Sequence, residues 1–157
     1  MSFTISGLPV EDFRPLFTLD TEALAARGII RRVATAKPGF PCRIGLRDAE
    51  LGETVLLLNH EHQPADSPYR SSYAIYVSEA AVETWSARDT IPSAMRGRPI
   101  ALRAFSDEGH LVGAEVAAGD HLEIAIERQL AAPGSAYLHA HNAAHGCFVA
   151  RIDRVET

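Results

Sequence analysis

Five of the seven histidines in this chain fall in two short segments, and imidazoles are the side chains best suited to chemistry here. The first segment holds His60 and His62, and the second holds His139, His141 and His145. Residues two apart on a strand share a face, so we expect His60 and His62 to point one way and His139 and His141 to do the same. If the two strands were neighbours, up to four imidazoles could converge on zinc, iron or copper.

Other features of the sequence do not require a metal. A cupin-type site would need a Glu a few residues after His62, but the nearest acid there is Asp66, and no second cupin motif follows. Histidines at strand ends also serve as hydrogen-bonded structural groups. We therefore predict no metal ligands, and keep one alternative metal set: His60, His62, His139 and His141. The sequence does not identify a cofactor.

Cys147 allows a second kind of chemistry, nucleophilic attack by a thiolate. Such a site would use His62 or His139 as the base and Asn142 to orient it. The chemistry needs an activated sulfur within hydrogen-bond reach of the base, which sequence cannot show. A buried structural thiol is the alternative, so the catalytic candidates are His62, His139 and Cys147, and whether the chain is an enzyme stays open.

A third possibility is a binding site without chemistry. Pro68 precedes Tyr69 and Arg70 at the end of a loop that follows the strand carrying His62. Arginine recognises carboxylate or phosphate through paired hydrogen bonds, and loops on a rigid strand often bind ligands. The alternative is a loop packed on the sheet, or a non-catalytic interaction module. We predict a pocket for an anionic small molecule at the end of the strand Val55–His62. Its expected ligand-binding residues are Asn59, His62, Tyr69, Arg70, His139 and Asn142.

The segments that carry these residues read as strands. Thr54–His62 begins with apolar residues on both faces, which is typical of a strand covered on both sides, and Ser71–Ser78 is its expected antiparallel neighbour. A hairpin is expected around a turn sequence at 106–109. The remaining expected strands are Ser2–Ile5, Ile29–Thr35, Cys42–Leu46, Pro99–Phe105, His110–Val116, Ala136–His141 and Cys147–Val155.

Helices are expected in three places. Asp20 or Thr21 can cap a helix over Glu22–Arg27, which Gly28 would end. A short helix over Glu79–Trp85 is plausible, and an Asp120 cap favours a helix over His121–Glu127, although that segment also alternates like a strand. The chain before Phe17 reads as an extended arm. Together these elements predict a single α+β domain over residues 1–157, with a mostly antiparallel sheet of about six to eight strands and two or three packed helices.

Composition limits the partners. The formal net charge of the 157 residues is −5, and the basic residues are scattered, so we expect no nucleic-acid surface. No apolar run reaches the length of a membrane span, and the first ten residues lack the pattern of a secretory signal. The two cysteines fit no paired motif, so we expect reduced thiols and a cytoplasmic protein. The oligomeric state is open.

Several segments resemble a bacterial family of proteins of about this length, grouped as domain of unknown function 1203. The resemblance covers nearly the whole chain, and its most specific part is the run from His62-Gln63-Pro64 to Pro68-Tyr69-Arg70. It implies a small stand-alone bacterial protein, assigns no reaction, cofactor or partner, and favours His62 over His60. The other matching segments are Ser2-Phe3 to Gly7-Leu8, Lys37-Pro38-Gly39 to Cys42-Arg43, Gly52-Glu53 to Leu58, Asn142 to Gly146-Cys147, and Ala150-Arg151.

Overall fold

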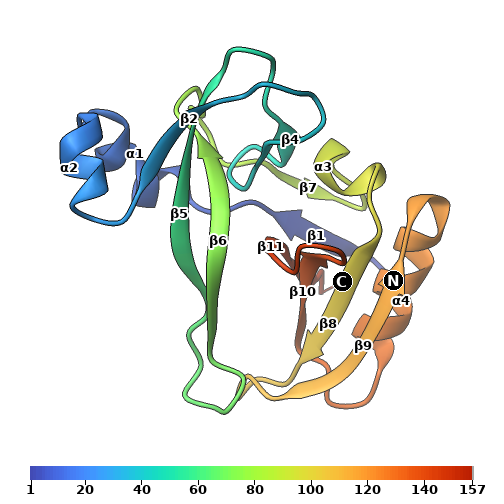
Figure 1. Ribbon diagram of the computed structural model, residues 1–157. Helices are drawn as coiled ribbons and strands as arrows, with labels where there is room; N and C mark the ends of the chain where they lie inside the picture. The colour runs from blue at the N-terminus through green and yellow to red at the C-terminus, as the bar shows by residue number, and fades with distance from the viewer. Residues whose placement is uncertain (157) are drawn as a thin grey trace.

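The computed structural model describes residues 1–156 and confirms the α+β class with mostly antiparallel strands. The strands form two sheets rather than one (Figure 1). The six-stranded sheet is antiparallel throughout. Its strands, in spatial order, are β7 (Ser86–Arg88), β1 (Phe3–Ser6), β11 (Phe148–Arg154), β10 (Tyr137–Asn142), β8 (Ile100–Phe105) and β9 (Leu111–Ala117).

The five-stranded sheet is built on the long β5–β6 hairpin that the sequence predicts. It has one parallel pairing, which joins Cys42 to Tyr76. Its strands, in spatial order, are β2 (Ile30–Val33), β5 (Thr54–Gln63), β6 (Ser71–Ser78), β3 (Pro41–Cys42) and β4 (Arg47–Asp48).

Helices pack against both sheets. The helix α4 (Leu122–Ala131) follows a 3-10 turn, η1 (Gly119–His121), and lies against β8 and β9 on the outer side of the six-stranded sheet (Figure 1). Alternate residues such as Leu102 and Leu138 pack under α4 because successive strand side chains point to opposite faces. The other face of that sheet is thereby left for the site.

The helices α1 (Val10–Phe17) and α2 (Thr21–Ala25) lie beside β5 (Figure 1). Phe13 of α1 shares a core with Leu56 and Leu58 of β5. A short helix, α3 (Ser93–Arg96), precedes β8. Because the apolar half of β5 is anchored in this way, the polar half of the strand has a fixed position.

The register of β5 shifts between Glu61 and Gln63, where the pairing with β6 is irregular. A bulge of this kind breaks the strict alternation of side chains. As a result, two successive residues turn inward: Gln63 is buried, and the Nδ1 atom of His62 is buried as well. Sequence alternation alone would have placed these two side chains on opposite faces.

Several predicted elements are confirmed. Asp20 caps α2 by accepting a hydrogen bond from Ala23 N at 2.8 Å, and Gly28 follows the helix with φ +72°. The helical interpretation of 121–127 is correct, but the side chain of Asp120 does not cap α4. The predicted strands on either side of the 106–109 turn and the last two predicted strands form β8, β9, β10 and β11.

Three predictions of local structure are wrong. The predicted strand Cys42–Leu46 ends at Cys42, because the chain turns back into β4 and Leu46 N bonds to Cys42 O. No helix forms over Glu79–Trp85, because Trp85 N donates to Ile44 O instead of to its own segment. The arm expected before Phe17 contains α1, which begins after Pro9 and buries Val10 and Phe13.

Candidate functional site

The structure brings three histidines from two sheets into one group. His62 of β5 faces His139 and His141 of β10, with ring centroids 6.2 Å and 4.8 Å away. The centroids of His139 and His141 are 6.3 Å apart. Phe148 of β11 stacks on His62 at 5.6 Å with an interplanar angle of 10°. We call His62, His139, His141 and Phe148 the histidine cluster.

The three imidazoles of the cluster are neutral at pH 7. Burial, with a smaller contribution from nearby His141 and His62, lowers the pKa of His139 to about 3. Burial likewise lowers the pKa of His141 to about 3 and that of His62 to about 4. Neutral imidazoles carry one N–H donor and one acceptor nitrogen each, so both functions are available for a ligand.

Each histidine of the cluster has a buried ring nitrogen without a partner. These atoms are Nδ1 of His62, Nδ1 of His139 and Nε2 of His141. The other ring nitrogen of His141 lies 2.9 Å from the carbonyl oxygen of Gly146. Since a carbonyl can only accept, Nδ1 of His141 carries the proton and Nε2 presents a lone pair. Buried polar atoms are normally paired, so three unpaired ring nitrogens in one place need an explanation, such as a water, an ion or a ligand.

A cation that has no partner among residues 1–156 faces this cluster. Arg103 of β8 pairs with His139 in the sheet register and is partly buried. Its charge lowers the pKa of His62, His139 and His141, although burial is the larger cause in each case. Within residues 1–156, Arg103 makes no hydrogen bond or ion pair. Burial also lowers the pKa of Arg103 itself. A guanidinium left without a partner in this position is suited to an anion.

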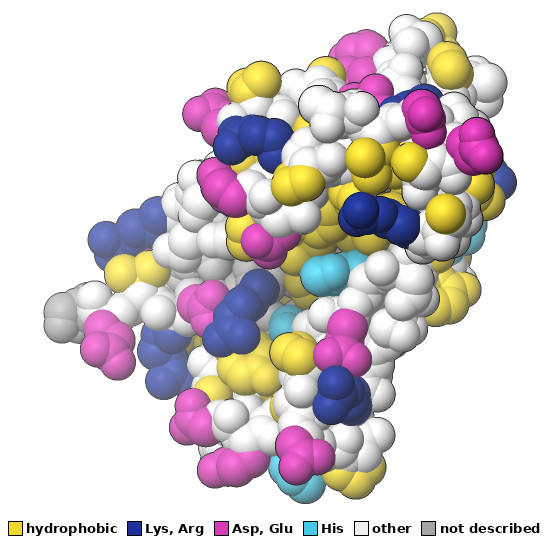
Figure 2. Space-filling model, turned by 90° about the vertical axis from the view of Figure 1, so that its left-hand side faces the viewer, with side chains coloured by type: hydrophobic (Ala, Val, Ile, Leu, Met, Phe, Trp, Pro, Cys, Tyr) yellow, Lys and Arg dark blue, Asp and Glu magenta, His cyan; other side chains and the backbone are white. Residues whose placement is uncertain are grey.

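Aromatic side chains surround the remaining sides of the cluster. The rings of Phe105 and Tyr137 lie 5.0 Å and 5.3 Å from that of His139. Gln63 donates to the Tyr137 hydroxyl at 3.0 Å, which ties β5 to β10 beside the cluster. Figure 2 shows histidine side chains gathered in a hollow of one face, with basic side chains next to it.

His60 stands apart from the other three histidines. Its ring lies between Phe13 of α1 and Phe148, at 6.1 Å and 6.2 Å. Among residues 1–156, no three His, Cys, Asp or Glu side chains are placed so that they could hold one metal ion. The four-histidine set expected as a metal alternative is therefore split by the ring of Phe148 into a trio and a separate His60.

The loop residues predicted to bind an anion have other contacts. Arg70 forms an exposed ion pair with Glu61 at 3.1 Å. The ring of Tyr69 packs edge-on against Phe105 and His110, so it touches the wall of the cluster rather than its centre. Asn59 is exposed on β5. Of the six predicted binding residues, the structure brings only His62 and His139 into the cluster.

Asn142 and Cys147 line a neighbouring cavity of about 270 Å³. The Cys147 sulfur accepts hydrogen bonds from Arg43 at 3.0 Å and from Asn142 Nδ2 at 3.4 Å. Neither His62 nor His139 is hydrogen-bonded to Cys147 within residues 1–156, so the predicted base is not in place. Both cysteines are free thiols.

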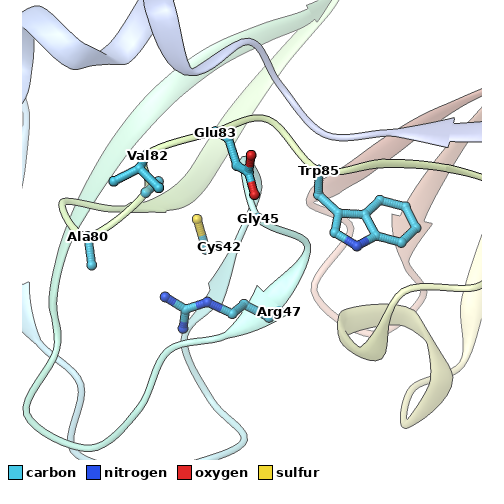
Figure 3. A pocket seen from close by; sticks show the side chains of 8 residues that line it. Cys42, Gly45, Arg47, Ala80, Val82, Glu83 and Trp85 are labelled. Atoms are coloured by element: carbon cyan, nitrogen blue, oxygen red, sulfur yellow. The ribbon is translucent and has the colours of Figure 1, made fainter.

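A second cavity, of about 230 Å³, lies on the other side of β3 and was not foreseen from sequence (Figure 3). The Cys42 sulfur and the guanidinium of Arg47 point into it, with Glu83 and Trp85 at its edge (Figure 3). Arg47 already pairs with Glu53, and Cys42 accepts from Ser78 N at 3.2 Å. Arg47 and Cys42 therefore already have partners, and neither leaves a buried polar atom unpaired as the histidine cluster does.

Sequence reasoning missed Arg103, Phe148 and Arg43. The signal for Arg103 was present, since it interrupts the strand Ile100–Phe105 on the face opposite the buried Leu102. An isolated charge inside an apolar strand marks a polar site or an ion pair. Arg43 gave no such signal, because it lies in a turn whose burial depends on a strand more than 100 residues later.

Comparison with known proteins gives one match. The family model described as a protein of unknown function (DUF1203) matches residues 39–154. The chain belongs to the DUF1203 family. The matched range includes every residue of the histidine cluster and Arg103. No curated protein and no solved structure matches the chain. The family description assigns no reaction, so the function rests on the site itself.

None of the helices within residues 1–156 is long and apolar enough to cross a bilayer.

Proposed function

We propose that this protein binds a small organic anion at the histidine cluster. The observation that carries the proposal is the position of Arg103, a partly buried guanidinium. It faces three neutral imidazoles, and among residues 1–156 neither the guanidinium nor one buried nitrogen of each imidazole has a partner. An oxyanion would pair with the guanidinium and accept hydrogen bonds from the N–H groups of His62 and His139, and from Nε2 of His141 once that ring takes up a proton. Both effects remove the cost of leaving these groups unpaired.

The surroundings define the rest of the ligand. Phe148, Phe105 and Tyr137 present ring surfaces next to the polar groups. Such a site suits a carboxylate or phosphate attached to an apolar body, because the rings bury the body while Arg103 fixes the charged end. Free inorganic anions share the charged contacts but lack the apolar ones.

Binding should be linked to proton uptake. An anion next to His62, His139 and His141 favours the imidazolium form, so it raises pKa values that stand at about 4, 3 and 3 in the free protein. Affinity should therefore increase as the pH falls from 8 to 6. Calorimetric titrations in buffers with different ionisation enthalpies measure the protons taken up, and zero uptake across that range would argue against contact between the anion and the imidazoles.

The direct test is a thermal-shift screen followed by calorimetry. The panel contains phosphate, phenyl phosphate, acetate, benzoate and succinate. We expect the members with an apolar body to stabilise most, and Arg103→Gln to weaken their binding by roughly tenfold to a hundredfold, the range for a lost charge-assisted hydrogen bond. Arg70→Gln is the matched control, since Arg70 is exposed and paired with Glu61.

Two outcomes would overturn the proposal. In the first, Arg70→Gln weakens binding while Arg103→Gln does not, which would move the site to the loop. In the second, the purified protein retains an equivalent of a transition metal that is lost in His141→Gln, because the nitrogens would then be occupied by the metal.

The cellular setting is part of the same proposal. We propose a bacterial protein of the cytoplasm that does not bind nucleic acid. The two free cysteines support a cytoplasmic location. The net charge of −5 disfavours binding to a polyanion such as nucleic acid.

A further inference from the structure

Arg43 is a buried cation with an unusual set of partners. Its side chain is 1% exposed, and its nitrogens donate to the carbonyl of Phe148, to the carbonyl of Pro41 and to the sulfur of Cys147. Within residues 1–156, no carboxylate lies within ion-pair distance of this guanidinium. A buried charge without a counter-charge is costly, and of these contacts only the Cys147 sulfur can become negative.

The sulfur of Cys147 is surrounded by donors. It lies 3.0 Å from a guanidinium nitrogen of Arg43 and 3.4 Å from Nδ2 of Asn142. A thiol sulfur is a weak acceptor, whereas a thiolate accepts strongly from charged and amide donors. Burial lowers the pKa of Arg43, and the neighbouring Cys147 opposes that effect, as expected when the two charges stabilise each other.

The same sulfur lines a cavity that has room for a ligand. The volume is about 270 Å³, and its wall includes Arg43, Asn142 and Cys147. The Oδ1 atom of Asn142 is buried without a partner, although its amide nitrogen is bonded to the sulfur. This oxygen is therefore an unsatisfied acceptor on a residue of the cavity wall, and a ligand N–H or O–H group that reached it would satisfy it.

We propose that Cys147 is held as a thiolate against Arg43 and is the nucleophile of this cavity, acting on small electrophiles that donate a hydrogen bond to Asn142. In the covalent step, a sulfur lone pair forms a bond to an electrophilic carbon, and the leaving group departs with the electron pair of the bond that breaks. The site adjoins the histidine cluster, because Arg43 donates to the carbonyl of Phe148, but the step uses none of the three imidazoles and no anion ligand.

The other titratable groups near the sulfur do not replace Arg43 in this role. His145, Tyr73 and Tyr76 line the same cavity, but none is hydrogen-bonded to Cys147 within residues 1–156. The charge of Arg98 also acts on Arg43, but Arg98 is paired with Asp48. Among residues 1–156, Arg43 is thus the cation in contact with the sulfur.

Alkylation of the full chain by iodoacetamide tests the proposal. The sulfur displaces iodide, and the amide of the probe supplies the N–H group for Asn142. We expect the rate at Cys147, followed by mass spectrometry, to change less than about threefold between pH 6 and pH 8, whereas an ordinary thiol of pKa about 8.5 gains roughly tenfold per pH unit. Cys147→Ser gives the baseline, and Cys42→Ser removes the other thiol. An ordinary tenfold rise per unit would overturn the proposal.

Variants of Arg43 identify the counter-ion. Arg43→Lys keeps the charge, so the alkylation rate at Cys147 should still change little with pH. In Arg43→Gln the rate should rise steeply with pH. A rate that changes little with pH in Arg43→Gln would contradict the ion pair. Because Arg43→Gln removes a buried group and could fail to fold, a second measurement uses no Arg43 variant. Absorbance at 240 nm should show a thiolate at pH 7 in the wild type that Cys147→Ser lacks, and equal absorbance in the two proteins would overturn the proposal.

Discussion

At the scale of the residue, the cluster shows how burial sets the charge of three histidines. His139 and His141 are almost fully buried, and their lowered pKa values keep them neutral under conditions in which an exposed imidazole titrates. In the unfolded chain, His139 and His141 take up protons near pH 6.5. In the folded chain they take up protons near pH 3. Between those values the unfolded state binds more protons, so the free energy of unfolding falls as the pH decreases.

His139→Phe tests this linkage. The new ring would lie among Phe105, Phe148 and Tyr137, so we expect stability at pH 7 to be kept. The loss of unfolding free energy between pH 7 and pH 5 should shrink by up to about 2 kcal/mol, which is the effect of one histidine whose pKa is depressed through that range. Urea unfolding at several pH values measures it. His121→Phe is the control, because His121 is exposed. If the free energy of unfolding changed equally with pH in the wild type and in His139→Phe, His139 would not be buried in its neutral form.

At the scale of the element, sequence predicted strands well and turns poorly. The β5–β6 hairpin could be predicted because Val55–Leu58 and the loop at 63–70 are local signals. Two other features could not be predicted from the sequence. They are the bulge that turns His62 and Gln63 inward together and the turn after Cys42 that buries Arg43. Both depend on partners from strands late in the chain, such as Tyr137 and Phe148, and local patterns do not report distant partners.

Gly7 follows β1 of the six-stranded sheet and lies against the turn after β3 of the five-stranded sheet. A Cβ atom at this position would lie 2.2 Å from the backbone oxygen of Ile44, which cannot move without shifting the turn after β3. We expect Gly7→Ala to lower the free energy of unfolding by about 2 kcal/mol or more, as for an overpacked core. Gly97→Ala is the matched control, because its Cβ would meet nothing within 4 Å. Equal urea midpoints for the two variants would show that the contact does not constrain the fold.

At the scale of the whole molecule, the α+β class followed from the sequence, but the division into two sheets did not. Alternation predicts which face of a strand is buried, and it is silent on which sheet that strand joins. The site depends on that division, since His62 comes from one sheet and His139 and Arg103 come from the other. Sequence indicated the two histidine segments that the fold brings together, and it offered Arg70, which pairs with Glu61, rather than Arg103 as the accompanying cation.

The hydrogen bond between Gln63 and Tyr137 joins the two sheets beside the cluster. Tyr137→Phe leaves the buried amide of Gln63 without this acceptor, and we expect a loss of about 1–3 kcal/mol of unfolding free energy. Tyr73→Phe is the control, because Tyr73 is 51% exposed and makes no hydrogen bond within residues 1–156. If calorimetric scans showed the same Tm for both variants, the bond would contribute nothing to holding the sheets together.

The most direct test of the anion site is nitrogen NMR of the histidine rings during titration of the wild-type protein with phenyl phosphate and with benzoate. The signals are assigned with single His→Gln variants. The account predicts that the rings of His62, His139 and His141 shift together toward the protonated form and saturate at one ligand concentration. If these three rings stay unchanged up to about 20 mM of either anion, well beyond a millimolar dissociation constant, the histidine cluster is not an anion site.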